Sequence, residues 1–262
     1  MAGNTRATVL AGGTDIFPAM AGRDALDSII DISSLSELRG ISATEEGLSI
    51  GALTTWSDII KAPLPAAFEG LRQAATQIGG VQIQNAATLA GNICNASPAA
   101  DSVPPLLTLD AHVTLASISG QRQINLEDFL LGPRRTSLAS DEILTSVFIP
   151  RPPEGTRSSF EKLGSRKFLV ISIAMVACLL RHAPDGRIAE ARIAVGAASP
   201  VARRLRQLEN DLVGQDAASA TITNAHLEPL APVDDARGSA KYRFAAVREL
   251  CKRAIREAAR VL

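Results

Sequence analysis

The chain has 262 residues, 46% of them apolar, and its 27 Lys and Arg balance 27 Asp and Glu. This apolar content is enough for a folded core, whereas a general binder of nucleic acid or anionic membranes would carry a basic excess. Aromatic residues make up only 3% of the chain, too few for a platform on which nucleic-acid bases stack.

The first 150 residues predict three strands, then a group of helices, then two further strands. Residues 7–10 predict a short strand, and alternating apolar positions predict two more over 26–32 and 48–52. A helix is expected after residues 54–58, and a second one over 66–78, closed by Gly79-Gly80. Residues 94–101 predict a loop, followed by a helix over 104–109 and strands over 112–117 and 142–149.

A domain boundary is predicted near residue 155, because residues 149–155 contain three prolines and a glycine. Beyond it, two strands over 171–181 and 187–197 are joined by Pro184-Asp185-Gly186, a sequence typical of hairpins. The C-terminal residues predict an amphipathic helix. Its apolar stripe comprises Phe244, Val247, Leu250, Cys251, Ala254, Ile255 and Ala258, and its basic face comprises Arg243, Arg248, Lys252, Arg253 and Arg256.

The first candidate site is the loop Ala11-Gly12-Gly13-Thr14-Asp15, directly after a predicted strand. Two glycines let the backbone turn sharply and approach a ligand, and consecutive N–H groups can bind an anion. Taken alone, an ordinary strand-to-helix turn with Asp15 as the helix cap is the commoner interpretation.

The second candidate site runs from Thr88 to Asp101 and combines small residues, hydroxyls, amides and one acid. This composition provides donors for phosphate oxygens and an acceptor for a ribose hydroxyl. The competing interpretation is a buried loop whose polar groups bond to one another. Neither loop contains the dinucleotide motif G-x-G-x-x-G or a P-loop, but two such loops in one domain favour a nucleotide ligand.

Conventional catalytic and metal-binding residues are not predicted. The histidines His112, His182 and His226 are scattered and are interpreted as strand or surface residues. The pairs Arg134-Arg135 and Arg203-Arg204 are interpreted as solvated faces. The cysteines Cys94, Cys178 and Cys251 are too few for the four thiolates of an iron–sulfur cluster, and their odd, sparse count favours a reducing compartment. We therefore expect a cytoplasmic protein without a membrane span.

The two loops together resemble the FAD-binding subunit of the molybdenum hydroxylases, the xanthine dehydrogenase and carbon monoxide dehydrogenase family. The matching segments are Ala11-Gly12-Gly13-Thr14-Asp15, Gln84 to Ile93, Ser97-Pro98, Asp101-Ser102, Glu161 to Lys167 and Ser239 to Arg243, which span almost the whole chain. The resemblance implies an α+β protein. Residues 1–155 would form a two-subdomain FAD-binding domain of the vanillyl-alcohol-oxidase (PCMH) type, and residues 156–262 a smaller α+β domain with an antiparallel sheet and helices. Because the family usually has more residues before the first glycine loop, the first domain is expected to be N-terminally short.

The resemblance also implies the residues that bind FAD. The first loop, Ala11 to Asp15, would wrap the pyrophosphate. The second loop would contact phosphate, ribitol and adenosine through Thr88, Gly91, Asn92, Cys94, Asn95 and Asp101. Ile78 and Leu144 match positions that pack near the flavin, and Lys162 matches a basic residue at the pyrimidine side of the ring, where positive charge favours a reduced, anionic flavin.

The function implied by the resemblance is electron transfer. A large molybdopterin-binding subunit would hydroxylate the substrate, and a small [2Fe-2S] subunit would pass electrons to FAD on this chain and then to NAD⁺, a quinone or another acceptor. The complex is expected to be a dimer of heterotrimers, a heterohexamer. The alternatives are a self-sufficient flavin-dependent oxidoreductase of the same cofactor fold, and an assembly protein that has lost its cofactor.

Overall fold

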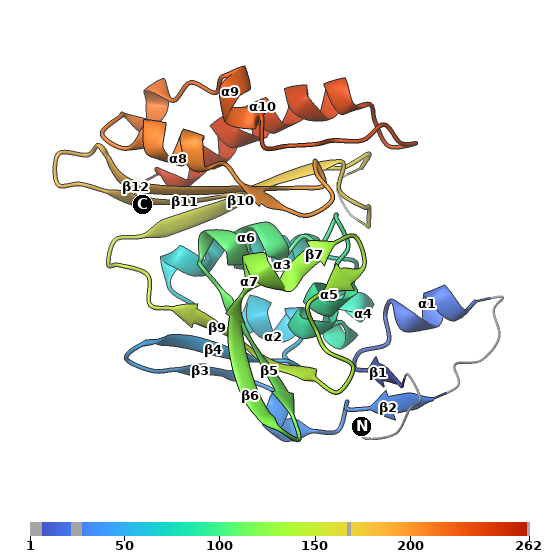
Figure 1. Ribbon diagram of the computed structural model, residues 1–262. Coiled ribbons are helices and arrows are strands. Elements are labelled where there is room, and N and C mark those ends of the chain that lie inside the picture. Colours follow the sequence, from blue (N-terminus) through green and yellow to red (C-terminus); the bar gives the residue numbers. More distant parts are fainter. Residues whose placement is uncertain (1–6, 22–27, 167–168, 261–262) are drawn as a thin grey trace.

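The computed structural model describes residues 7–21, 28–166 and 169–260, which form an α+β protein, as predicted (Figure 1). Leu26 and Asp27, at the start of a predicted strand, lie outside these residues, as do Lys167 and Phe168. The strands are β1 (Thr8–Leu10), β2 (Ile29–Asp31), β3 (Ile41–Ala43), β4 (Gly47–Gly51), β5 (His112–Ser117), β6 (Gly120–Asn125), β7 (Leu130–Gly132), β8 (Arg135–Thr136), β9 (Ile143–Pro150), β10 (Arg157–Leu163), β11 (Ala174–His182), β12 (Ile188–Gly196) and β13 (Arg203–Arg204). The α-helices are α1 (Ile16–Met20), α2 (Trp56–Lys61), α3 (Glu69–Gln77), α4 (Val81–Ala86), α5 (Leu89–Asn95), α6 (Val103–Thr108), α7 (Leu126–Phe129), α8 (Arg206–Leu212), α9 (Asn224–Leu227) and α10 (Ala240–Ala258).

A five-stranded antiparallel sheet organises the first half of the chain, in the order β3-β4-β9-β5-β6. The long strand β9 lies at its centre, where Val147 is in register with Ile50 of β4 and Val113 of β5. All three side chains are completely buried, so this register places an apolar row under the helices. A separate parallel pair, β1-β2, lies beside this sheet, next to α1 (Figure 1).

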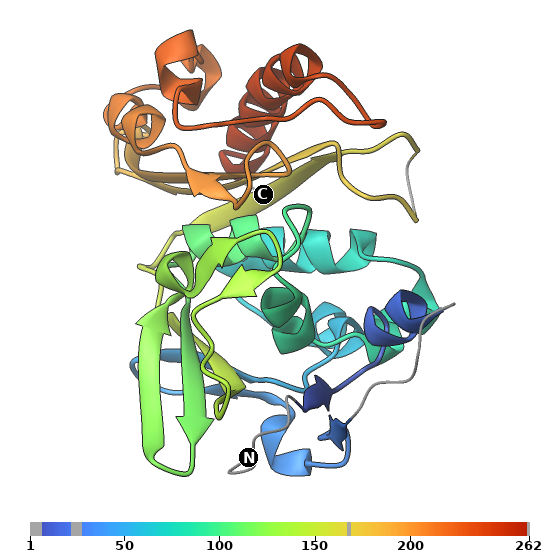
Figure 2. The same cartoon turned by 45° about the vertical axis from the view of Figure 1, so that its right-hand side comes forward.

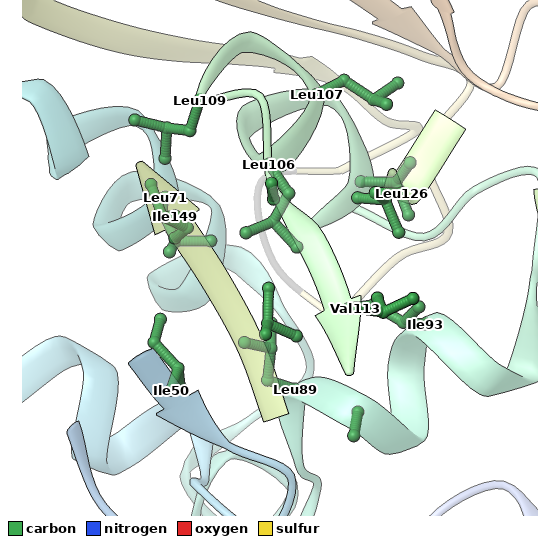
Figure 3. Packing of buried hydrophobic residues seen from close by; sticks show 14 of the residues in the cluster. Ile50, Leu71, Leu89, Ile93, Leu106, Leu107, Leu109, Val113, Leu126 and Ile149 are labelled. Carbon is green, nitrogen blue, oxygen red and sulfur yellow. The ribbon is translucent and has the colours of Figure 1, made fainter. Parts of the chain in front are cut away.

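The main hydrophobic core joins this sheet to the helices above it (Figure 3). Sheet residues Ile50, Val113 and Ile149 pack with Leu89 and Ile93 of helix α5. Burial of each such side chain contributes about 1.5–3 kcal/mol. The core therefore fixes α5, the helix formed by part of the second candidate loop, to the sheet.

The second half of the chain forms a four-stranded antiparallel sheet in the order β10-β11-β12-β13. Its hairpin β11–β12 turns at Pro184-Asp185-Gly186 as predicted, and Gly186 has a φ of 83°. The amphipathic helix α10 packs on β10 and β11, whereas α3 and α6 lie against the other side of this sheet (Figures 1 and 2). A second core, formed between the sheet and helices α8, α9 and α10, accompanies it.

Two separate cores support a division of the chain into two domains, and we propose the boundary near residue 155, between β9 and β10. Contacts cross this boundary, since Ser158 Oγ donates to Ala67 O over 2.7 Å. The next residue on the strand, Ser159, donates from its Oγ to Ala254 O of helix α10 in the second half, also over 2.7 Å. Strand β10 is thus bonded both to the first half and to helix α10.

The structure corrects four sequence-based interpretations. Residues 94 and 95 belong to helix α5 rather than to a loop, and the helix ends at Ala96, whose φ is 45°. Arg243, predicted on a basic helix face, is buried, and its guanidinium donates to Ala197 O over 3.0 Å and to Asp235 Oδ1 over 2.6 Å. Arg204, predicted on a solvated face, is also buried and is paired with Glu209.

His226, interpreted as a strand or surface residue, is buried on the short helix α9. Its Nδ1 accepts a hydrogen bond from Thr223 N over 3.2 Å, and its Nε2 lies 2.9 Å from Asp211 Oδ2. The ring caps the start of the helix, so its role in the structure is local. Arg204, Arg243 and His226 are thus buried together with polar partners, which the sequence pattern does not identify.

Candidate cofactor-binding site

A pocket of about 340 Å³ lies between the first glycine loop and helices α4 and α5. Its elements lie together at one side of the molecule, next to α1 (Figure 1). All the predicted cofactor residues except Asp101, Leu144 and Lys162 line it. These are Ala11, Gly12, Gly13, Thr14, Asp15, Ile78, Thr88, Gly91, Asn92, Cys94 and Asn95.

The first glycine loop packs directly on the end of helix α4. A Cβ atom added to Gly12 would lie only 1.8 Å from Ala86 O, so no larger residue fits at this position without moving the backbone. Gly13 has a φ of 70°, in the left-handed region that glycine adopts readily. The two adjacent glycines are therefore explained by two different needs: close packing at Gly12 and a turn at Gly13.

The backbone N–H groups of this pocket-lining loop are the next feature of the site. Among the residues that the structure describes, no protein acceptor bonds to the N–H groups of residues 11–16. Asp15 is the N-cap residue of α1, the position that the ordinary-turn interpretation gives it, but its side chain makes no capping hydrogen bond. A run of free N–H groups along a turn favours an anionic group such as a phosphate.

Helix α5 forms the opposite wall of the pocket. Thr88 caps its start, with Oγ1 accepting from Gly91 N over 3.0 Å. Asn92 is held from behind by Ser102 Oγ, which donates to Asn92 Oδ1 over 2.7 Å. Because burial raises the pKa of Cys94 to about 12, this residue contributes a neutral thiol to the wall. The wall offers polar groups but no charge.

Five of the lining residues that were not predicted from the sequence are apolar: Val9, Ile16, Trp56, Ile83 and Ala87. Trp56 is fully buried and is the first residue of helix α2. Thr55 caps this helix, and its side chain and that of Asp58 each bond to the other residue's backbone N–H. The Thr-x-x-Asp spacing predicts that helix start, but nothing in the sequence connects Trp56 with the pocket. The apolar residues provide the surface that a ring system needs.

Asp101 and Lys162 form a separate buried pair close to the pocket. Lys162 Nζ donates to Asp101 Oδ2 over 2.6 Å, and Ser172 Oγ donates to Asp101 Oδ1. Burial raises the pKa of Asp101, and the Lys162 ammonium and the Ser172 hydroxyl oppose that rise in part. Lys162 Nζ also lies 3.4 Å from the backbone oxygen of Gln77, and the next residue, Ile78, lines the pocket.

Leu144 lies elsewhere, in strand β9. It is buried in the main hydrophobic core and pairs in register with Leu115 of β5. The structure thus brings the predicted residues into three places: the pocket, the Asp101–Lys162 pair beside it, and Leu144 in the core.

The residues fit a flavin dinucleotide. Among the described residues, no protein acceptor bonds to the N–H groups of the glycine loop, which are therefore available to a pyrophosphate, and Asp15 is the only charged residue that lines the pocket. Within the described ranges, no group of three His, Cys, Asp or Glu side chains gathers as a metal site. The helices of the described residues include none long and apolar enough to cross a membrane.

Comparisons with known proteins find relatives that match nearly the whole chain. A family described as "FAD binding domain in molybdopterin dehydrogenase" matches residues 1–152, and one described as "CO dehydrogenase flavoprotein C-terminal domain" matches residues 159–258. The chain is 35% identical to a xanthine dehydrogenase FAD-binding subunit of Escherichia coli O157:H7, over 98% of this chain and 90% of that one. It is 36% identical to a nicotinate dehydrogenase FAD-subunit of Eubacterium barkeri, over 86% and 76% of the two chains.

A solved structure has the same fold. A chain of the carbon monoxide dehydrogenase from Hydrogenophaga pseudoflava superposes with a TM-score of 0.88 at 29% identity, covering 98% of this chain and 90% of that one.

Proposed function

The chain belongs to the FAD-binding subunits of the xanthine dehydrogenase and carbon monoxide dehydrogenase type of molybdenum hydroxylases, and we propose that it carries electrons from a partner subunit to a soluble or membrane-borne acceptor. Members of this family are flavoprotein subunits of oxidoreductases. The observation that carries the proposal is the pocket between the glycine loop and helix α5, where the N–H groups of residues 11–16 have no acceptor among the described residues.

We assign FAD to this pocket as follows. The loop from Ala11 to Asp15 holds the pyrophosphate through its N–H groups, and Thr88, Gly91, Asn92, Cys94 and Asn95 provide the facing wall. Ile78 packs against the ring system. Micromolar affinity needs about 8 kcal/mol, so the loop, the wall and the apolar lining residues must act together.

Asp101, Leu144 and Lys162 act from behind the pocket. Lys162 supplies a positive charge beside Ile78 through its contact with Gln77 O, and Asp101 holds that ammonium in place. Leu144 supports the site from the core below α5, since α5 packs on β9. When FAD is bound, it supplies the redox chemistry, because it exchanges electrons one or two at a time.

The partners follow from what the chain does not carry itself. Three cysteines cannot provide the four thiolates of a [2Fe-2S] cluster, so the clusters belong to a small partner subunit. The molybdopterin and the substrate site belong to a large subunit, and we propose a dimer of heterotrimers. We place the complex in the cytoplasm, since all three cysteines are free thiols.

The identity of the electron acceptor, NAD⁺ or a quinone, can be tested on the purified flavoprotein. Anaerobic addition of NADH bleaches the flavin absorbance near 450 nm if NAD⁺ is the natural acceptor, because electron transfer is reversible. A reduced quinone analogue bleaches it instead if a quinone is the acceptor. Bleaching by neither donor, together with turnover of an organic substrate by this chain alone, would contradict the proposed role and favour a self-sufficient oxidoreductase.

A further inference from the structure

Arg134 is bonded to a residue of the pocket wall, although the sequence places it in an ordinary basic pair. It lies in the turn between strands β7 and β8, and its Nη1 donates to the side-chain oxygen of Asn95 and, over 3.4 Å, to Asn95 O. Asn95 is the last residue of helix α5 and lines the pocket. The described residues that line the pocket include no Arg or Lys, so this guanidinium is a cation tied to the wall from outside.

The backbone around Arg134 is shaped for this contact. Arg134 has a φ of 58°, which is unfavourable for a residue with a side chain, and its N–H donates to Ala96 O over 2.9 Å. Ala96 itself has a φ of 45° and ends helix α5. Backbone and side chain of Arg134 therefore satisfy two carbonyls at the C-terminal end of the helix, which would otherwise lack partners.

The chemistry of the two side chains fixes the direction of the amide. A guanidinium has donors only, so the group of Asn95 that it bonds must be the carboxamide oxygen. The remaining polar group of Asn95 is its NH₂, which can only donate. Asn95 thus offers the pocket a donor, as a ligand rich in carbonyl, hydroxyl or phosphate oxygens requires.

We propose that Arg134 is a positioning residue of the flavin site, which holds Asn95 so that its NH₂ group donates to FAD. The inference rests on the proposed binding of FAD in this pocket. It adds a residue that does not itself line the pocket and acts through another side chain.

The test measures FAD affinity in the complex of the full chain with its partner subunits, after removal of flavin and by titration of flavin fluorescence. We expect Arg134→Ala and Asn95→Ala each to weaken FAD binding about tenfold. Asn95→Ala removes the hydrogen bond from the amide to FAD, and Arg134→Ala removes the contact that orients this amide. The double variant should bind FAD no more weakly than Asn95→Ala alone, because both changes remove the same contact. Arg134→Lys should restore part of the affinity, since an ammonium also donates.

Arg135→Ala is the matched control, because Arg135 is the exposed neighbour in strand β8. It should leave FAD affinity within about twofold of wild type. A merely structural role for Arg134 would lower the unfolding midpoint and leave FAD affinity unchanged, or its effect would multiply with that of Asn95→Ala; either result overturns the inference. If the wild-type complex takes up no FAD, the proposed function fails, and the inference fails with it.

Discussion

Lys162 and Asp101 form a buried ion pair that joins the two halves of the chain, with 2.6 Å between Nζ and Oδ2. Asp101 precedes helix α6 in the first half, whereas Lys162 lies on β10 in the second half. The Asp101 side chain is 9% exposed and the Lys162 side chain 4%, so neither charge is well hydrated. The same ammonium reaches Gln77 O, beside the pocket, so the pair links the packing of the two halves to the candidate flavin site.

Removing one charge of this pair should be strongly destabilising. Asp101→Leu leaves the Lys162 ammonium buried without its carboxylate, which costs about 3–5 kcal/mol. Lys162→Met should have a similar cost, because it leaves the carboxylate unpaired. Urea unfolding of the purified chain measures both.

The double variant, Asp101→Leu with Lys162→Met, separates loss of the pair from loss of packing. Since a buried ion pair and an apolar pair differ little in net stability, its cost should be clearly smaller than the sum of the two single costs. Costs that simply add would show that the two charges do not depend on each other.

Gly12→Ala should reduce FAD affinity by about tenfold or more, equivalent to about 1.4 kcal/mol. The new Cβ would lie 1.8 Å from Ala86 O, so the loop must move away from helix α4 and its N–H groups move with it. Flavin content after purification and FAD titration measure the effect. Gly132→Ala is the control, because an added Cβ meets no atom within 4 Å there, and it should keep wild-type flavin content.

Cys94 should react slowly with iodoacetamide between pH 7 and pH 9, although it lines the pocket. Burial raises the pKa of this thiol to about 12, and a raised pKa keeps it protonated over this whole range. The reactive thiolate fraction then increases about tenfold per pH unit without levelling off. Peptide mass spectrometry follows the rate at Cys94, and a rate that starts to level off above about pH 8.5 would show an ordinary exposed thiol.

Glu209→Ala should destabilise the second half of the chain by about 3–5 kcal/mol. Glu209 Oε1 accepts from Ile193 N over 2.8 Å and from buried Arg204 Nε over 2.7 Å, so its loss leaves two buried donors without this partner. Urea unfolding measures the change. Glu249→Ala, which breaks an exposed pair with Arg253 one helical turn away, serves as the control and should cost no more than about 0.5 kcal/mol.

The elements with strong local patterns were predictable from the sequence. The hairpin of β11 and β12 follows from Pro184-Asp185-Gly186 between two apolar runs, and β5 was predicted with its observed bounds. Strand β6 was missed because Gln121, Arg122 and Gln123 are polar and exposed on the sheet edge. Strand β10 was missed because its residues, Arg157 to Leu163, do not alternate, and their burial depends on α3 and α10 packing on them.

The family and its cofactor were recognisable from the sequence, and the comparisons confirm both. The site could be predicted only as far as local motifs reach, since the glycine loop and helix α5 each carry their own sequence pattern. The pairing of Asp101 with Lys162 and that of Asn95 with Arg134 join residues 61 and 39 positions apart. No spacing rule predicts such pairs, because the packing of β10 and of the β7–β8 turn creates them.

The most direct test of the account is the flavin content of the complex purified with its partner subunits. The visible spectrum, acid release and mass identification of the chromophore together give its identity and its ratio to this chain. We predict one FAD per chain, with its content strongly reduced by Gly12→Ala and unchanged by Gly132→Ala. A fully assembled complex without FAD on this chain would contradict the account.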